Sequence, residues 1–405
     1  MSYTYDFASN SQPMDLEGYY WLNGECLSRA FCLELPPRMA DLLDVAMAVY
    51  AADRRSPRDF KGANTGQRCI HIRLAVREPT TWASSEMSGR LRELLSWLSE
   101  DVWSFQFVKR EAAPWPAESK SFLFQLPPER PAIVSLFSGG LDSLAGLAAR
   151  AQQEPDRSLV LVSGYTNDRL RYQQRVQVQS IKSAWRDGGL APGKVPDIRH
   201  VAVPFGIHKL EGHHEEKSQR TRALVFLTLG VAVALQAAAD TLWVYENGVG
   251  ALNLPLNETQ LGVDNYRGVH PVSLMIIREI FERVLERAIH IRNPFLFTTK
   301  AQMCLALEPG GLADLVRDTV SCDGFPQRVA NQPQCGYCTS CILRRQSLHA
   351  AGLGDYDATA GYRHDVLNRR IAFTLNQIYG LEAMCDQVEK LAGCLSSEYP
   401  WQALV

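Results

Sequence analysis

The sequence predicts an α/β protein built on a doubly wound parallel sheet, with a zinc-binding C-terminal portion and an additional N-terminal α+β domain. Three observations indicate this architecture. Short apolar segments alternate with helical ones after about residue 131, a pair of glycines follows the first of these segments, and four cysteines cluster near the C-terminus. Strands that are apolar throughout and alternate with helices are typical of a parallel sheet covered on both faces.

The central region, residues 131–315, carries this alternation. Its predicted strands are Ile133–Phe137, Leu159–Val162, His200–Val203 and Leu242–Tyr245. Its predicted helices, from apolar spacing of three and four residues, are Leu144–Gln152, Arg169–Trp185 and Thr221–Ala238. The carboxyl ends of the strands are expected to meet at one edge of the sheet, where such folds bind ligands.

Two flanking regions, residues 1–130 and 316–405, follow other patterns. The first is predicted to be an α+β domain, which carries no catalytic signature and which we interpret as a partner-binding unit. Its predicted helices and strands are Leu42–Tyr50, Cys69–Val76, Met87–Leu98 and Val102–Val108. The second is expected to hold a metal and to end in helices that pack on the metal site, of which Asn368–Leu381 is the clearest.

Composition and charge narrow the functional classes. The 405 residues are 46% apolar and 21% charged with a formal net charge of −2, which predicts a globular protein and gives no reason to expect a nucleic-acid partner. The most apolar run, Ala223–Ala239, is rich in alanine and interrupted by Gly230, so it is predicted to be a buried helix. We therefore expect a cytoplasmic protein with no membrane partner, whose ten cysteines are reduced thiols or metal ligands.

A phosphate-binding turn is predicted where the first central strand meets its helix. The residues of this turn are Ser138, Gly139, Gly140, Leu141, Asp142 and Ser143. Paired glycines let an anion approach the backbone closely, and the helix start that follows supplies unpaired N–H groups. Asp142 is suited to cap the helix or to position magnesium. A simple capping turn is the alternative, and neither the lysine of a Walker loop nor a G-x-G-x-x-G pattern is present.

Four cysteines near the C-terminus have the spacing of a metal site. They are Cys322, Cys335, Cys338 and Cys341. Four thiolates at this spacing can surround Zn²⁺ tetrahedrally and leave no open position for water, so we predict a structural zinc ion. An iron–sulfur cluster and unliganded thiols remain the alternatives.

The turn resembles the S-G-G-x-D-S motif of PP-loop ATP pyrophosphatases. That resemblance implies ATP cleavage between the α and β phosphates. Turn and cysteines together are similar to the 7-cyano-7-deazaguanine synthase family, whose C-terminal signature also includes an arginine that matches Arg344. Arg222 with Phe226 matches a helix start of that family, although Ala223 stands where the family has asparagine, and Asn293–Lys300 resembles its segment ending in Thr/Ser-Lys.

Two departures from that family concern the substrate. The Tyr-Pro-Asp-Cys-Arg stretch associated with deazaguanine recognition is absent, and Glu246–Pro255 and then Asp264–Pro271 stand in its approximate place. Residues 1–130 also have no counterpart. Both features resemble a divergent branch of bacterial antiphage defence, found in Qat systems and in type IV CBASS. That branch implies activation of a 7-deazaguanine precursor and its joining to the N-terminal amine of a partner protein from the same operon.

The resemblance implies roles for individual residues, with ATP, magnesium and zinc as cofactors. The implied catalytic residues are Asp142, Lys300 and Arg222. The implied nucleotide-binding residues are the turn Ser138 to Ser143 together with Tyr165. Glu246, Asn247 and the following Gly248 are predicted to join them, because Glu246 and Asn247 end a core strand at the ligand edge of the sheet. The substrate candidates are Arg267, His270 and Arg344. A free nitrile synthase using ammonia, a tRNA-modifying thiolase and a nucleotide-binding subunit without turnover remain alternatives, and a homodimer is compatible with all of them.

Overall fold

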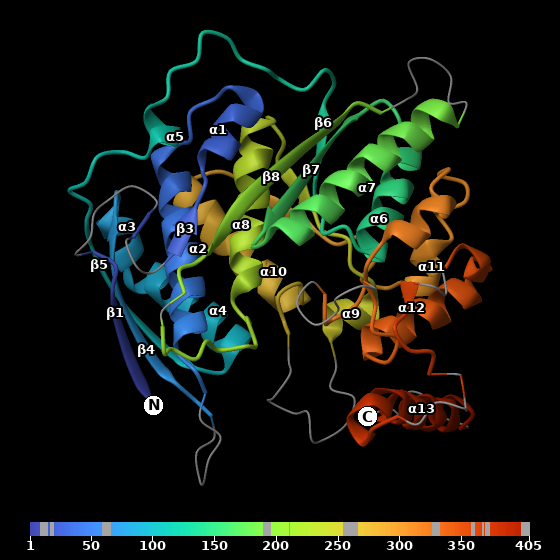
Figure 1. Cartoon of the computed structure of the whole chain (residues 1–405). Coiled ribbons are helices and arrows are strands. Elements are labelled where there is room, and N and C mark those ends of the chain that lie inside the picture. Colours follow the sequence, from blue (N-terminus) through green and yellow to red (C-terminus); the bar gives the residue numbers. More distant parts are fainter. Residues whose placement is uncertain are drawn as a thin grey trace.

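A computed structural model of the chain shows two sheets with helices packed around them (Figure 1). It describes residues 1–8, 15–16, 20–58, 66–188, 196–209, 211–253, 266–325, 333–357, 361–366, 368 and 373–397. None of the described helices is both long and apolar enough to cross a membrane.

The larger sheet has seven strands in the order β10-β9-β6-β7-β8-β3-β2. Five of them are parallel, and these are β6 (Ala132–Leu136), β7 (Ser158–Tyr165), β8 (Ile198–Ile207), β9 (Thr241–Trp243) and β10 (His290–Arg292). Every residue of β7 is buried, as expected for a strand covered on both faces. The parallel sheet and its four predicted strands are confirmed, with shifts of a few residues at their ends.

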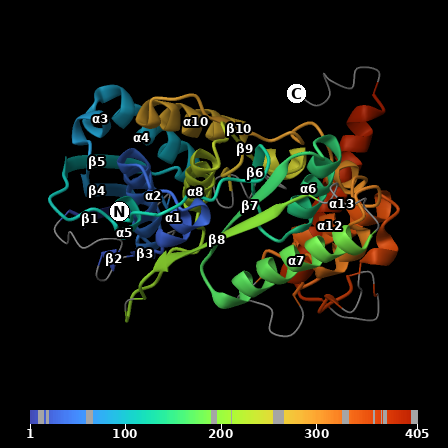
Figure 2. The ribbon, with the colours of Figure 1, turned by 90° about the horizontal axis from the view of Figure 1, so that it is seen from above.

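Helices on both faces make this sheet doubly wound (Figure 2). One face carries α6 (Leu141–Gln153) and α7 (Asp168–Asp187), and the other carries α8 (Arg222–Gln236) and α10 (Pro271–Leu285). The chain runs from β6 to β7 and β8 on one side and returns to β9 and β10 on the other, so the strand order reverses between β6 and β9. Ligands of such sheets bind outside the carboxyl ends of the strands at this reversal.

The N-terminal segment forms a second sheet, of three parallel strands. These are β1 (Ser2–Asp6), β4 (Cys69–Val76) and β5 (Val102–Lys109). The helices of this segment are α1 (Glu25–Phe31), α2 (Pro37–Arg55), α3 (Pro79–Ala83), α4 (Ser85–Ser99) and α5 (Pro116–Ser119). Parallel pairing with intervening helices makes this segment α/β, where the sequence indicated α+β.

Two short strands of the same segment belong to the larger sheet, which the sequence did not predict. They are β2 (Asp15–Leu16) and β3 (Tyr20–Leu22), and β3 pairs antiparallel with β8. One apolar core runs from α2 and β4 into α8 and β8. The N-terminal segment and the sheet therefore share a core, while the division at residue 130 stays a prediction.

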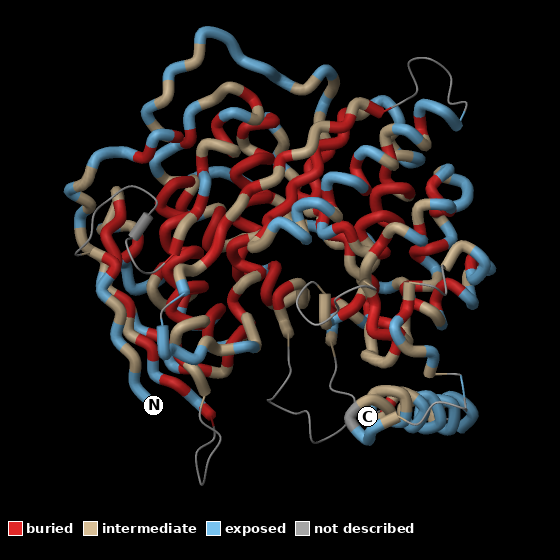
Figure 3. Tube along the Cα trace, in the orientation of Figure 1, coloured by how far each residue is buried: buried red, intermediate tan, exposed pale blue. Residues whose placement is uncertain are grey.

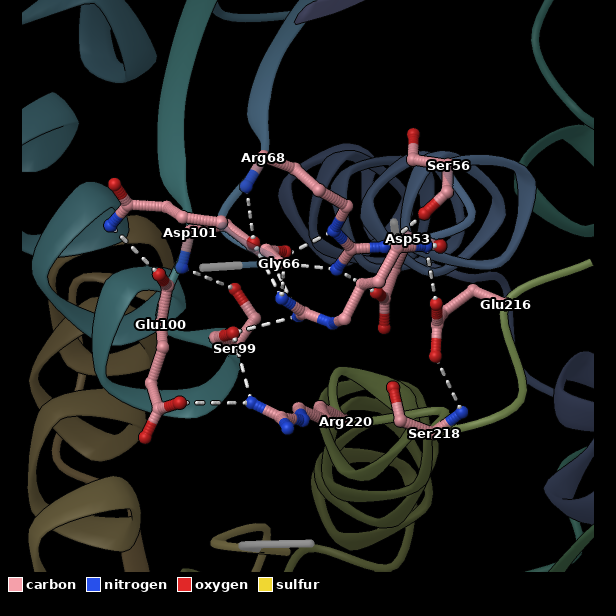
Figure 4. Close-up of polar contacts among 12 residues, drawn as sticks. Asp53, Ser56, Gly66, Arg68, Ser99, Glu100, Asp101, Glu216, Ser218 and Arg220 are labelled. Atoms are coloured by element: carbon pink, nitrogen blue, oxygen red, sulfur yellow. Dashed lines mark hydrogen bonds and ion pairs between the residues drawn. The ribbon is translucent and has the colours of Figure 1, made fainter. Parts of the chain in front are cut away.

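A buried ion-pair network joins the N-terminal segment to the start of α8 (Figure 4). Arg68 and Asp53 are both fully buried, and Arg68 donates to Asp53 Oδ1 at 2.6 Å and to Asp101 Oδ2 at 2.6 Å. The second oxygen of Asp53 accepts from the Thr221 hydroxyl at 2.9 Å and from its backbone N–H at 3.2 Å. Asp53 therefore bonds the residue that immediately precedes α8.

The C-terminal part is mostly helical, and its last helix lies apart from the rest. The elements not yet named are α9 (Gly248–Leu252), α11 (Lys300–Cys304), η2 (Ala313–Asp318), α12 (Thr339–Ala350), η3 (Gly354–Tyr356) and α13 (Leu375–Leu395). Most of α13 is exposed (Figure 3). The prediction of a helix from Asn368 was wrong at its start, because Asn368 is not helical and α13 is capped by Thr374 with Gln377.

Candidate functional site

The predicted phosphate-binding turn leads from β6 into the first turn of α6. Gly139 has a φ of +83°, which favours glycine. Ser138 and Ser143 close the turn through a 2.9 Å bond between their hydroxyls, and the Gly140 N–H donates to Ser138 Oγ at 3.2 Å. A Cβ on Gly140 would lie 3.4 Å from the backbone oxygen of Val320, so the turn is packed between neighbouring segments.

Four polar side chains meet beside this turn, at the reversal of strand order. Asp142 accepts from Asn247 Nδ2 at 3.1 Å and from Lys300 Nζ. The same Asn247 amide donates to Glu246 Oε1 at 2.8 Å. Residues 246 and 247 lie between β9 and α9, Asp142 lies in the first turn of α6, and Lys300 begins α11. Three separate parts of the chain therefore contribute to one cluster.

Local structure fixes each member of this cluster. Asn247 caps α9 by accepting from the Gly250 N–H at 3.0 Å, and Thr299 with Gln302 forms a capping box around Lys300. A Cβ on Gly250 would lie 2.1 Å from Glu246 Oε1, so a residue larger than glycine there would displace the carboxyl group. The cluster is therefore preorganised by helix starts.

A second glycine of this region, Gly248, is also required by close packing. A Cβ on Gly248 would lie 2.3 Å from the Leu296 backbone oxygen. Asn293 Nδ2 donates to the Glu246 backbone oxygen at 2.8 Å, which ties the ends of β9 and β10 together. Two stretches, Glu246–Pro255 and Asp264–Pro271, were predicted to replace the family's substrate motif. Residues 254–255 of the first and 264–265 of the second lie outside the described residues.

Burial and charge shift the pKa values in this cluster. Burial, together with the charge of Asp142, raises the pKa of Glu246 to about 8, although Lys300 acts in the opposite direction. For Lys300, burial works to lower the pKa, but Asp142 and Glu246 more than offset it and the pKa is raised. At neutral pH the site therefore holds a lysine cation and a protonated Glu246.

Tyr165 lies at the end of β7, one strand away from the turn. It is 9% exposed, and the guanidinium of Arg171 lies 5.6 Å from its ring centre. Its position at the carboxyl edge agrees with the expectation for a nucleotide contact, which stays a prediction.

Arg222, Arg267 and His270 make their contacts outside the Asp142 cluster, and those of Arg267 and His270 are with the N-terminal segment. Arg222 begins α8 and donates to Gln219 Oε1 at 2.8 Å. Arg267 donates to the Trp97 backbone oxygen at 2.8 Å, and its guanidinium lies 4.4 Å from the Trp97 ring centre. The His270 ring lies 5.2 Å from the same tryptophan, and its Nδ1 caps α10.

Arg344 is fully buried in α12, and its guanidinium holds the segment that follows η2. It donates to the Val316 backbone oxygen at 2.7 Å and to Asp357 Oδ1 at 3.1 Å, and it also bonds the Thr319 hydroxyl. That segment reaches the phosphate-binding turn, where the Val320 N–H donates to the Gly139 oxygen at 3.4 Å. The arginine thus supports the turn through neighbouring backbone.

The four predicted metal ligands come together as one cluster. The sulfur atoms of Cys322, Cys335, Cys338 and Cys341 all lie within 4.8 Å of one another. Sulfurs around Zn²⁺ lie roughly 3.8 Å apart when the Zn–S bonds are about 2.3 Å, so this group fits a tetrahedral zinc ion. The N–H groups of Gly324 and Cys335 both donate to Cys322 Sγ at 3.3 Å, which favours the thiolate form that binds metal.

Sequence reasoning missed the polar residues that lie behind the turn. His200 of β8 bonds the Ser163 hydroxyl at 2.9 Å, and Ser163 donates to the Phe137 oxygen at 2.6 Å. Burial lowers the pKa of His200 to about 4, with a smaller effect from Lys182, so the imidazole is neutral. Gln177 of α7 lies against Gly139. A strand histidine and helix glutamines carry no sequence signal for such a role.

Part of the chain is similar in sequence to a known protein. The chain is similar to a 7-cyano-7-deazaguanine synthase from Novosphingobium aromaticivorans, with 26% identity over 247 aligned residues. The match covers 56% of this chain and 94% of the synthase. No protein-family profile matches the chain. The similarity supports the resemblance to a synthase-like family that the turn and the cysteines indicated.

Proposed function

We propose that this chain is an ATP-dependent enzyme that adenylates the carboxylate of a 7-deazaguanine compound and joins it to the amine of a partner protein in antiphage defence. The observation that carries the proposal is the cluster of Asp142, Asn247, Lys300 and Glu246 beside the Ser138–Ser143 turn. A cation, a carboxylate and helix-start amides at the strand-order reversal suit a bound nucleoside triphosphate.

The nucleotide would be held by backbone and charge. The amide hydrogens at the start of α6 face the position of an oligophosphate, and Lys300 supplies a positive charge where negative charge develops. Asp142, whose side chain is 16% exposed, is the residue that would hold magnesium. Bound magnesium would neutralise part of the negative charge on the phosphate oxygens and so reduce their repulsion of the attacking carboxylate.

The substrate carboxylate is a poor electrophile, so the proposed reaction begins with its activation. A substrate carboxylate oxygen attacks the α-phosphorus of ATP, the bond to the β-phosphate oxygen breaks and pyrophosphate leaves. A neutral amine then attacks the acyl carbon of the adenylate, AMP leaves and one proton is released. Holding amine and adenylate together lowers the barrier of the second step.

The cysteine cluster has a structural part in this proposal. Four sulfur ligands would fill the coordination sphere of zinc and leave no position for a reacting water. Cys341 and Arg344 lie three residues apart on one face of α12. Arg344 in turn holds the segment that touches the turn. Zinc would therefore stabilise the scaffold of the nucleotide site.

A nitrile synthase is the second candidate, and the similarity to a 7-cyano-7-deazaguanine synthase favours it. Ammonia would then replace the protein amine and give an amide. The amide oxygen would then attack the α-phosphorus of a second ATP, with release of pyrophosphate and one proton, and loss of AMP and a second proton would give the nitrile. The Asp142 cluster serves both candidates equally, because they share the first step.

One experiment separates these functions. The purified protein is incubated with ATP, magnesium and 7-carboxy-7-deazaguanine, with either ammonia or the protein encoded beside it in the operon. A deazaguanine adduct in the intact mass of that protein supports conjugation, whereas free nitrile supports the synthase. Lys300→Met serves as the inactive control. No pyrophosphate release in either reaction would leave a nucleotide-binding subunit and contradict the proposal.

A further inference from the structure

Two buried glutamines of α7 lie directly behind the phosphate-binding turn. Gln177 is fully buried and Gln174 is 2% exposed. A Cβ on Gly139 would lie 3.2 Å from Gln177 Oε1 and 3.6 Å from Gln174 Cγ, so both side chains pack against this glycine. The neighbouring Gln173 donates to the Asp318 backbone oxygen, so α7 also contacts the end of η2, which leads to Val320 beside the turn.

Three of the four amide atoms of these glutamines lack a hydrogen-bond partner among the described residues. Within the described part of the chain, neither amide atom of Gln177 has one, nor does Oε1 of Gln174. Gln174 Nε2 reaches only the Gly164 oxygen, at 3.4 Å. Buried amides are normally paired, and an unpaired one destabilises the folded chain. A methionine of similar size would fill this space without that cost, so the amide points to a partner present in another state.

Peptide geometry indicates what that partner is. The N–H and C=O of one peptide point in opposite directions, so a turn that aims its N–H groups at an anion aims its carbonyls at the protein behind it. Among the described residues, the Gly139 carbonyl accepts from the Val320 N–H alone, at a long 3.4 Å. Gln177 Oε1 lies 3.2 Å from the position of a Cβ on the same glycine, and a flip of this unpaired amide would bring the donor Nε2 to that place.

We propose that Gln177, assisted by Gln174, is a positioning residue of the phosphate-binding turn. Its Nε2 donates to a carbonyl of the Ser138–Gly139–Gly140 backbone when the N–H groups of the turn bind the phosphates of ATP. The bound turn thus gains a hydrogen bond that the free turn lacks. This inference rests on the proposed nucleotide-binding function and adds a residue to it.

The test compares Gln177→Met with Gln179→Met, an exposed glutamine of the same helix. Thermal unfolding and calorimetric titration with magnesium ATP are measured for both variants and for the wild-type chain. Q177M is expected to unfold at a higher temperature and to bind ATP about tenfold more weakly, the loss of one hydrogen bond of the bound state. Q179M is expected to change neither quantity. Gln174→Met, as a second variant, is expected to change both in the same directions.

Opposite changes in stability and affinity distinguish this role from ordinary packing. Unchanged ATP affinity in Q177M and Q174M would overturn the inference while the nucleotide-binding function stands. A lower unfolding temperature together with weaker binding would also overturn it, because the amide would then be paired in the free chain. A wild-type chain that does not bind ATP would overturn both the inference and the proposed function.

Discussion

Glu246 is the site residue whose protonation depends most on its surroundings. It accepts from Asn247 at 2.8 Å and lies close to Asp142, so its charged form is penalised by burial and by a neighbouring carboxylate. Its pKa is raised to about 8. A proton on Glu246 at neutral pH limits the negative charge next to the phosphate-binding turn, which favours an anionic ligand.

Replacing Glu246 by glutamine should change how stability depends on pH. The folded chain keeps a proton on Glu246 up to about pH 8, whereas the unfolded chain releases it near the ordinary value of 4.5. The stabilisation from this proton is complete below pH 4.5 and is lost as the pH rises through 8. Between pH 6 and pH 8, the free energy of unfolding in urea should fall by up to about 3 kcal/mol more for the wild-type chain than for E246Q. Glu389→Gln, on exposed α13, is the control, and parallel curves for wild type and E246Q would contradict the prediction.

Lys300 and Asp142 should behave as a coupled pair. Their side chains are 9% and 16% exposed, so Lys300→Met leaves the Asp142 carboxylate without its cation in a largely buried position. We expect K300M to lose about 1–3 kcal/mol of unfolding free energy and at least about a hundredfold in pyrophosphate release.

A double-variant cycle checks this coupling. Asp142→Asn combined with K300M should recover part of the lost stability, because no unpaired charge remains, while activity stays low. Strictly additive losses of stability in the double variant would show that the pair is not coupled.

At the scale of elements, local periodicity was sufficient for the central helices and strands. The predicted Arg169–Trp185 helix lies within α7, and the predicted Leu159–Val162 strand lies within β7. Strands β2 and β3 have two and three residues, too short for an alternating pattern, and they form because the larger sheet offers β8 as a partner. Long-range pairing of this kind is not encoded in a local window.

The candidate site was predictable where it follows strand ends and where a family motif carries it, as at Lys300. Residues such as Asn247 were identified because the carboxyl ends of parallel strands share one edge. Asp53 and Gln177 were not, because each lies inside a helix whose sequence also fits an ordinary partly buried face, and their partners are distant in the chain. Their contribution appears only when separate elements come together.

The loop between the metal-ligand cysteines depends on one glycine. Gly336 has a φ of +87°, and a Cβ there would lie 1.9 Å from the His364 oxygen. Gly336→Ala should therefore displace the flanking Cys335 and Cys338, reduce bound zinc from one per chain to a small fraction and lower the unfolding temperature. Zinc content by metal analysis and thermal unfolding measure the two effects.

A matched glycine separates backbone strain from crowding in this test. Gly352 also has a positive φ, +73°, but a Cβ there meets nothing within 4 Å. Gly352→Ala should cost about 1 kcal/mol of stability and leave the zinc content unchanged. Equal zinc content in both variants would exclude a structural role for the close contact at Gly336.

At the scale of the whole molecule, the N-terminal segment is part of the scaffold that carries the candidate site. It supplies β3 to the larger sheet, packs α2 against α8 and shares one apolar core with both (Figures 1 and 3). Asp53 bonds Thr221 directly before α8, and Arg222 begins that helix. The geometry around Arg222 therefore depends on residues far from it in sequence.

Cooperative unfolding follows from this shared core. Removal of residues 1–130 should leave a chain that does not fold, because it exposes the faces of α8 and β8 that α2 and β3 cover. Removal of residues 374–405 should leave the rest folded, since α13 packs mainly against α12 among the described elements and is mostly exposed. Solubility and circular dichroism of the two truncations distinguish these cases.

A single substitution tests the same cooperativity in the full-length chain. Asp53→Ala removes one partner of a fully buried ion pair and leaves Arg68 and Thr221 short of an acceptor, so we expect a loss of about 3 kcal/mol. Because the network links the N-terminal segment to α8, which packs on the larger sheet, tryptophan fluorescence should follow the same urea transition as far-UV circular dichroism. Trp82 and Trp103 of the N-terminal core contribute to that fluorescence together with Trp185 and Trp243 of the central region. Two separated transitions in D53A would mean that the segment unfolds on its own, and the ion pairs would then be a contact between independent domains rather than part of one core.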